Sequence, residues 1–181
     1  MTTETINNSL QLICGELIKD IKNRYGNDSG ACYLTGYVLE RVFTNLGYSS
    51  KEVTGVLQLK DINGKWVIYG PDSYQKFGKL VGYYHTWCSV VLNDVEYIID
   101  PTPVTMRSYL KKNCNIKLSK NIPDHIVSTV SKSFNFIYIV DESLNPKSKF
   151  FLDRISNLDK DMFIKLTLNK AKSHFQAISD V

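Results

Sequence analysis

Apolar residues recur in the N-terminal part of the chain at the three- and four-residue spacing of an amphipathic helix. One such pattern covers residues 5–24, and a second covers residues 31–46. The run Gly-Asn-Asp-Ser-Gly at 26–30 breaks the first helix, and Asp28 or Ser29 can cap the second. The pattern therefore predicts two successive helices.

The hydrophobic period changes to two after residue 50. Residues 53–59 and 66–69 have the composition and alternation of strands, and they flank Asn63 and Gly64, a strong signal for a tight hairpin. A polar and aromatic loop follows at residues 70–80. These segments predict that a sheet begins directly after the two helices.

A second predicted hairpin, residues 82–102, has the sequence GYYHTWCSVVLNDVEYIIDPT. If Asn93 and Asp94 are the two loop residues, the turn fixes every pair across the two strands. One face is then almost wholly apolar, and we expect it in the core: it pairs Leu92 with Val95, Val90 with Tyr97, and Cys88 with Ile99.

The opposite face of this hairpin carries a histidine and a carboxylate. Trp87 lies opposite Asp100, and His85 lies one step beyond Trp87 on the same face. Diagonal neighbours on paired strands are close enough for their side chains to meet. A carboxylate beside an imidazole is the orienting half of a nucleophilic triad.

The chain is less regular after residue 102. A short helix is predicted at 124–132, a strand at 134–140, and helices at 146–157 and 159–178. No repeat or linker divides the sequence, so residues 1–181 are expected to form one α+β domain. Its N-terminal helices would pack on an antiparallel sheet, and its C-terminal part would be mostly helical.

The composition is that of an ordinary globular protein, with 43% hydrophobic and 22% charged residues and a net charge of +4. The basic residues are scattered, so charge indicates no nucleic-acid surface. No apolar run approaches the roughly 20 residues of a membrane span, and no signal peptide is visible. We expect a cytoplasmic protein with no nucleic-acid or membrane partner, and export by a route without an N-terminal signal stays open.

Four cysteines occur without CxxC spacing, which indicates neither a disulfide framework nor a zinc site. A set of His85, Cys88 and Cys114 matches no standard zinc pattern, and we expect no metal and no cofactor. Cys14 and Cys88 fall on apolar faces and are expected in the core, whereas Cys114 is expected in a loop.

Cys32 differs from the other cysteines because it falls in the first turn of the second predicted helix. Unpaired backbone N–H groups and the helix dipole stabilise a thiolate at that position. A helix that begins with Cys32, a strand with His85 and an adjacent strand with Asp100 make a buildable nucleophilic site.

Two segments resemble the transglutaminase-like superfamily. GACYLTGYVLERVFTNLGY resembles the family's nucleophile helix, in which a small residue and a cysteine precede a helix that ends in Leu-Gly. HTWCSVVLNDVEYIIDPT resembles the family's histidine strand followed by its Asp-Pro-Thr strand. The resemblance covers residues 30–102; it departs at Cys88 and Ser89, where acidic or apolar residues are common.

This resemblance implies a papain-like fold with a catalytic core over about residues 26–102 and a helical extension over about residues 104–181. It also implies that Cys32 is the nucleophile, His85 the base and Asp100 the orienting acid. Trp87 matches the family's aromatic residue two positions after the histidine.

Further residues are candidates for substrate contact. A developing oxyanion needs donors; the backbone N–H of Cys32 is expected to be one, and Asn27, Gln58 and Trp66 are alternatives for the second. The loop at 70–80 is expected to border the groove. The groove candidates are Trp87, Tyr84, Tyr74 and Phe77.

The chemistry implied is acyl transfer through a thioester on an amide of a protein or peptide. Hydrolysis, as by a protease, deamidase or amidase, is favoured because one small domain offers little shielding of a thioester from water. Transfer to an amine, as by a transglutaminase, and another acyltransferase activity, for instance with an acyl-coenzyme A donor, are alternatives. A noncatalytic binding protein on the same fold is the alternative of another class.

Overall fold

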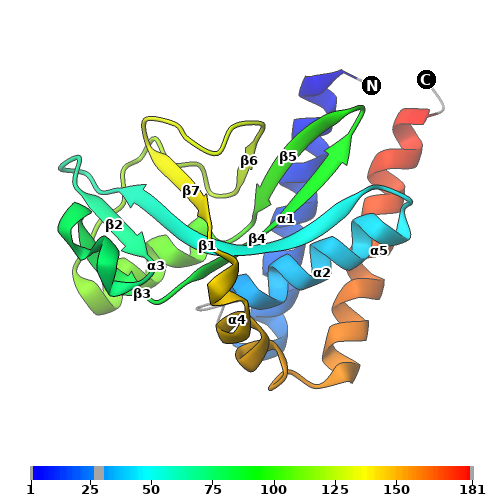
Figure 1. The fold of residues 1–181 in the computed structure, drawn as a ribbon. Coiled ribbons are helices and arrows are strands. Elements are labelled where there is room, and N and C mark those ends of the chain that lie inside the picture. The colour runs from blue at the N-terminus through cyan, green and yellow to red at the C-terminus, as the bar shows by residue number, and fades with distance from the viewer. Residues whose placement is uncertain (1, 27–30, 180–181) are drawn as a thin grey trace.

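The computed structural model describes residues 2–26 and 31–179, which fold as an α+β protein with helices and a mixed sheet (Figure 1). The helices are α1 (Thr3–Tyr25), α2 (Cys32–Asn45), α3 (Pro103–Cys114), α4 (Asn145–Leu152) and α5 (Asn157–Ser179), with 3-10 turns η1 (Asp72–Phe77) and η2 (Glu142–Leu144). The strands are β1 (Ser50–Lys60), β2 (Trp66–Tyr69), β3 (Lys79–Gly82), β4 (His85–Leu92), β5 (Val95–Asp100), β6 (Ile126–Ser128) and β7 (Phe136–Val140).

The long strand β1 organises the sheet. Its N-terminal half pairs with β4, its C-terminal half pairs with β2, and β7 also pairs along it, all antiparallel. The strand order is β3-β2-β1-β4-β5-β6, with β7 attached to β1. Because β2 and β3 pair in parallel, the sheet is mixed and not antiparallel throughout as predicted.

The hairpin of β4 and β5 has the predicted register. Asn93 and Asp94 have φ angles of 50° and 61°, the left-handed conformation of both central residues in a type I′ turn. The ladder accordingly pairs Leu92 with Val95, Val90 with Tyr97 and Cys88 with Ile99. The turn thus sends the odd-numbered residues of β4 to one face and the even-numbered ones to the other.

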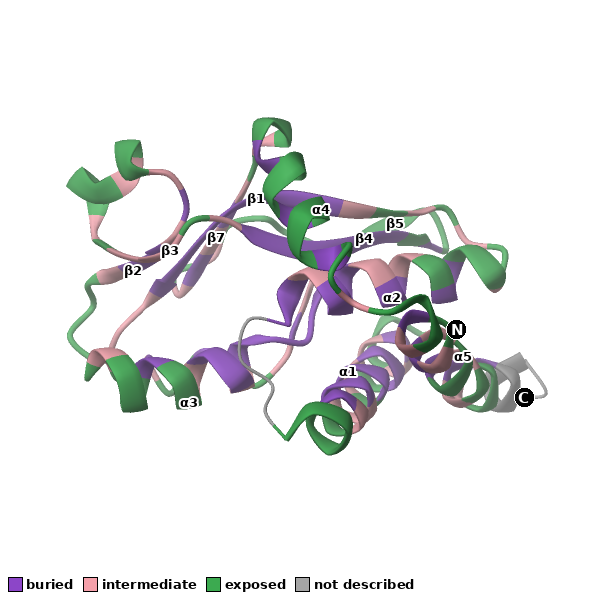
Figure 2. Ribbon diagram, turned by 90° about the horizontal axis from the view of Figure 1, so that it is seen from below, coloured by how far each residue is buried: buried purple, intermediate pink, exposed green. Residues whose placement is uncertain are grey.

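The helices α1, α2 and α5 cover one face of this sheet (Figures 1 and 2). Their apolar stripes pack against the even-numbered side of β4 and the odd-numbered side of β5, and Figure 2 shows buried residues concentrated along the sheet, α1 and α2. Cys14 and Cys88 lie in this core as predicted. The members from the hairpin are Cys88, Val90, Leu92, Tyr97 and Ile99.

A second apolar cluster occupies the opposite face of β4. Trp87 packs there with Leu57 of β1, Met106 of α3 and Tyr138 of β7. A third, small cluster around Val56 lies on the face of β1 that points away from Leu57. His85 and Trp87 share the face of the second cluster, so that cluster surrounds the candidate site.

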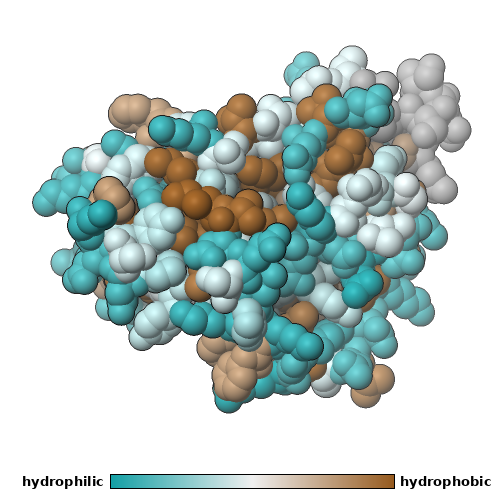
Figure 3. Space-filling model, viewed as in Figure 1, coloured by the Kyte–Doolittle hydropathy of each residue, from teal (hydrophilic) through white to brown (hydrophobic). Residues whose placement is uncertain are grey.

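Part of the surface is apolar. Figure 3 shows hydrophobic residues gathered over the region of the sheet around β7, at whose end Val140 is 61% exposed. Among the described residues, no helix has both the length and the apolar character that crossing a bilayer requires.

The chain after residue 102 corrects several predictions. Residues 126–128 are strand β6, where a helix was predicted over 124–132, because they pair with the open edge of β5. The helix α3 was missed, although Pro103 at its first turn and Asn115 at its left-handed C-cap are helix boundary signals. This part of the chain is helical in α3, α4 and α5, but it also adds β6 and β7 to the sheet.

Candidate active site

Cys32 is the first residue of α2, where the sequence pattern places it. The N-cap residue Ala31 has no side-chain oxygen, so it cannot accept a hydrogen bond from the backbone N–H groups of the first turn. Gly36 allows this helix to lie close to β4, since a Cβ there would be 2.8 Å from Cγ2 of Thr86. The start of α2 is thereby held beside the start of β4.

His85 and Asp100 form a buried pair on neighbouring strands. His85 begins β4, Asp100 ends β5, and both side chains are 0% exposed. Nε2 of His85 is 2.7 Å from Oδ2 of Asp100. The predicted diagonal contact is therefore present.

Asp100 accepts hydrogen bonds from three residues. Oδ1 accepts from the backbone N–H of Thr102 at 3.0 Å and from its hydroxyl at 2.7 Å. Oδ2 accepts from the hydroxyl of Tyr138 at 2.7 Å, in addition to its bond with His85. Four hydrogen bonds hold the carboxylate in one orientation and favour its charged form.

The two members of the pair shift each other's pKa in opposite directions. Burial by itself lowers the pKa of His85, but the charge of Asp100, the hydrogen bond to it and the nearby Cys32 raise it to about 10. Burial likewise raises the pKa of Asp100, but the charge and hydrogen bond of His85 and the hydrogen bonds of Thr102 lower it below its usual value. Each partner therefore favours the charged form of the other.

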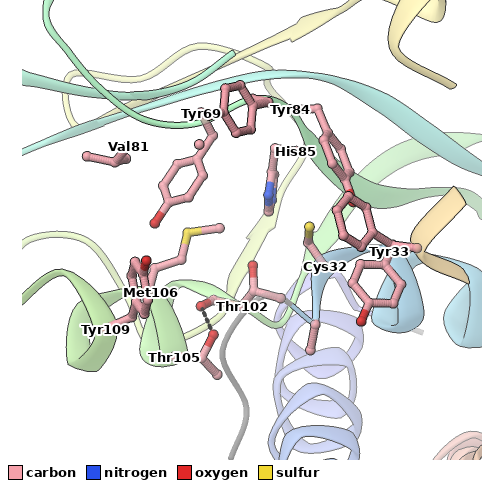
Figure 4. Close-up of a pocket in the computed structure, with 14 residues that line it drawn as sticks. Cys32, Tyr33, Tyr69, Val81, Tyr84, His85, Thr102, Thr105, Met106 and Tyr109 are labelled. Carbon is pink, nitrogen blue, oxygen red and sulfur yellow. Dashed lines mark hydrogen bonds between the residues drawn. The ribbon is translucent and has the colours of Figure 1, made fainter. Parts of the chain in front are cut away.

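The imidazole is oriented toward the thiol. Nε2 of His85 is occupied by Asp100, and Nδ1 is buried without a hydrogen-bond partner among the described residues. In Figure 4 the sulfur of Cys32 points toward the His85 ring. A buried ring nitrogen without a partner is costly in a purely structural role, and this one faces a thiol.

A cavity of about 490 Å³ opens onto the thiol. Cys32 is 9% exposed and lines it together with His85, while Asp100 lies behind the histidine. The wall contains tyrosine and phenylalanine rings from five separate segments and no Asp, Glu, Lys or Arg among the described residues. The lining residues besides Cys32 and His85 are Ala31, Tyr33, Tyr69, Val81, Gly82, Tyr83, Tyr84, Thr102, Thr105, Met106, Tyr109 and Phe151.

The alternatives for a second oxyanion donor are not brought to this cavity. Gln58 alternates with Leu57 along β1, so its side chain lies on the face opposite that of His85. Trp66 pairs with Lys60 on that same far face, and its ring lies under the Lys60 ammonium. Both expectations are corrected for the same reason, the period of two along a strand. Asn27 lies outside the described residues.

Only one of the four groove candidates lines the cavity, and that is Tyr84. Trp87 is 2% exposed and packs against the His85 ring at a centroid distance of 6.2 Å, so it supports the histidine from inside the core. Tyr74 packs on the small cluster around Val56, and Phe77 is exposed at the end of η1. The loop at 70–80 therefore does not border the cavity; the segment that follows it, from Val81 onward, does.

Several site residues were not foreseen. All of them come from elements after residue 102: Met106 and Tyr109 from α3, Tyr138 from β7, and Phe151 from α4. The pattern of the segment 134–140 predicts a strand, but it gives no sign that Tyr138 reaches Asp100. The helix boundary signals of α3 were the one local clue to Met106 and Tyr109.

Comparison of the chain with protein-family models, with curated proteins and with solved structures finds no match. The described residues contain no group of three or more His, Cys, Asp or Glu side chains arranged to hold a metal ion.

Proposed function

We propose that this protein is a cysteine-dependent acyl-transfer enzyme that hydrolyses an amide through a thioester. The observation that carries the proposal is the His85 ring. One of its nitrogens is bonded to a carboxylate held by four hydrogen bonds, and the other is unpartnered and faces the thiol of Cys32 at a cavity.

The reaction has two halves. In the first, the sulfur of Cys32 attacks the amide carbonyl carbon, a C–S bond forms, the C–N bond breaks, and His85 gives its proton to the leaving amine. In the second, His85 takes a proton from water as the water oxygen attacks the thioester, and the C–S bond breaks to return the thiolate. Asp100 remains charged and holds the imidazole throughout.

The backbone N–H of Cys32 is the proposed donor to the oxyanion, because it belongs to the free N–H groups of the first helical turn. The order of a helix with cysteine, a strand with histidine and an adjacent strand with aspartate supports a papain-like arrangement of the core. A protein or peptide is the proposed substrate.

Water is the proposed acceptor because the cavity is open to solvent where Phe151 and Tyr83 line it, at 40% and 73% exposure. The acceptor is tested by partitioning once an acyl substrate has been found. If millimolar primary amine diverts most of the thioester into the amide product, the protein is a transferase.

Alkylation with iodoacetamide at neutral pH, read by peptide mass spectrometry, tests the site without a known substrate. Cys32 is expected to be labelled much faster than Cys114, which is half-buried and is the last residue of α3 instead of lying in a loop as expected. His85→Ala is expected to slow the labelling of Cys32 alone. Buried Cys14 and Cys88 serve as internal controls and should react only in urea. Equal rates at Cys32 and Cys114, or no effect of His85→Ala, would indicate a noncatalytic binding protein.

A further inference from the structure

The cavity has two unlike halves on either side of the thiol. In Figure 4, Tyr69, Val81, Met106 and Tyr109 lie on one side of Cys32 and His85, and Tyr33 and Tyr84 lie on the other.

The half that contains Met106 and Tyr109 is the more enclosed, and we call it the α3 half. Met106 is 7% exposed and packs in the cluster around Trp87, with Tyr69 and Val81 against that cluster. The hydroxyl of Thr105 donates to the backbone carbonyl of Thr102 at 2.9 Å, so its polar group is already occupied. What this half offers a ligand is therefore the thioether of Met106, the isopropyl group of Val81, and the rings and uncharged hydroxyl groups of two tyrosines.

The opposite half leads outward along an aromatic wall. Phe151 is stacked on Tyr33 at 5.8 Å and on Tyr84 at 6.1 Å between ring centroids. Arg154 lies 6.0 Å from the Phe151 centroid, and Lys147 lies 5.8 Å from that of Tyr83, so the first cations appear only at the outer rim.

We propose that the α3 half binds an uncharged aromatic or branched aliphatic group next to the scissile bond, and that Met106 and Tyr109 determine this specificity. This rests on the proposed function, since the acyl carbon must reach Cys32. A charged group in this half would lose its hydration without gaining a counter-ion from the described lining residues. An apolar group gains the free energy of leaving water, and the remainder of the substrate follows the aromatic wall to solvent.

Aryl iodoacetamides that carry the selected group to the thiol test this proposal. N-phenyl iodoacetamide is compared with iodoacetamide and with the para-carboxylated N-phenyl reagent, each rate being divided by the rate with glutathione. Partial burial of the ring should give the neutral aryl reagent an advantage of about tenfold over iodoacetamide. The carboxylated reagent should lose most of that advantage.

Charge is then added to the protein at two neighbouring positions. Tyr109→Lys introduces a cation on the α3 half at a side chain that is 38% exposed, so the fold should tolerate it. It should raise the rate of the carboxylated reagent at Cys32 several-fold and lower that of the neutral aryl reagent. Ser108→Lys adds the same charge one residue earlier on α3, at an exposed residue that does not line the cavity, and should change neither rate.

Size is tested at Met106. Met106→Ala should reduce the preference for the aryl reagent over iodoacetamide, whereas Met162→Ala on α5, at a half-buried methionine outside the cavity, should not. Equal rates for neutral and carboxylated reagents, or equal effects of the two lysine variants, would overturn the proposed specificity. If instead His85→Ala does not slow the labelling of Cys32 by plain iodoacetamide, the proposed function is overturned. The two failures are therefore distinguishable.

Discussion

Tyr138→Phe isolates one hydrogen bond of the buried network. The hydroxyl donates to Oδ2 of Asp100 at 2.7 Å, and the tyrosine ring is fixed by edge contacts with Trp87 at 4.9 Å and Phe136 at 5.7 Å between centroids. Phenylalanine preserves these ring contacts and removes only the donor. The variant therefore measures what the hydrogen bond contributes.

The expected cost follows from the charge of the acceptor. A hydrogen bond to a charged group contributes roughly 1.5–3 kcal/mol, and Asp100 retains three other donors, so we expect a loss of about 2 kcal/mol in the free energy of unfolding at pH 7. For a chain of this length that loss lowers Tm by about 4–8 °C. The pKa of Asp100 should rise toward its ordinary value in the variant, because one group that favours the charged form is gone.

Urea unfolding followed by far-UV circular dichroism measures the change. Tyr97→Phe is the matched control, since Tyr97 is 1% exposed on β5, the strand that also carries Asp100, and its hydroxyl has no hydrogen-bond partner within residues 2–26 and 31–179. A double-mutant cycle with Asp100→Asn removes the charge, and Tyr138→Phe should cost clearly less in that background. If the two tyrosine variants cost the same, or the cost is unchanged beside Asp100→Asn, the assigned role of Tyr138 is wrong.

Two further predictions concern the ion pair between β4 and β5 and the contact between β1 and β7. The pKa of His85 rises from 6.5 to about 10 on folding, so the contribution of His85 to stability is full below about pH 6.5 and is lost as pH rises through 10. The pKa of Asp100 is lowered on folding. The contribution of Asp100 is therefore present above about pH 4 and is lost as pH falls through its folded pKa. The unfolding free energy of the wild type minus that of His85→Gln should therefore be largest between about pH 4 and 6.5 and should shrink toward pH 10, and a flat difference would refute the ion pair. Gly55→Ala should destabilise the protein by about 2–4 kcal/mol in the same urea assay, because a Cβ there would clash with the backbone carbonyl oxygen of Ile139 in β7. A change within about 0.5 kcal/mol would mean that β7 is held less tightly than the structure shows.

The local pattern of the chain was sufficient to predict the elements whose structure is set by residues close to one another in the sequence. Asn93 and Asp94 tolerate positive φ, so the turn and the register of β4 and β5 follow from the sequence. The contact of His85 with Asp100 is a consequence of that register. The helical stripe of α2 likewise places Cys32 at a helix start without reference to the rest of the chain.

Predictions failed where a residue's role depends on a partner distant in sequence. Ile126 and Val127 favour a strand locally, but three residues are too few for a periodic pattern, and it is the pairing with the edge of β5 that makes them a strand. Gln58 and Trp66 were chosen by residue type, but the face on which a strand residue lies is set by the pairing of β1 with β2 and β4. The loop at 70–80 is next to the histidine strand in sequence, yet η1 packs on the other face of the sheet.

The sequence by itself determined the two N-terminal helices, the central hairpin and the pairing of an imidazole with a carboxylate, because turn chemistry and side-chain alternation act over a few residues. Only the tertiary structure decided that Tyr138 of β7 holds Asp100, and that Met106, Tyr109 and Phe151 enclose the thiol. Those residues follow Cys32 by more than 70 positions, and they reach it because β7 pairs with β1 and α3 packs against the sheet. Such contacts depend on the whole packed core, and no local pattern in the chain records them.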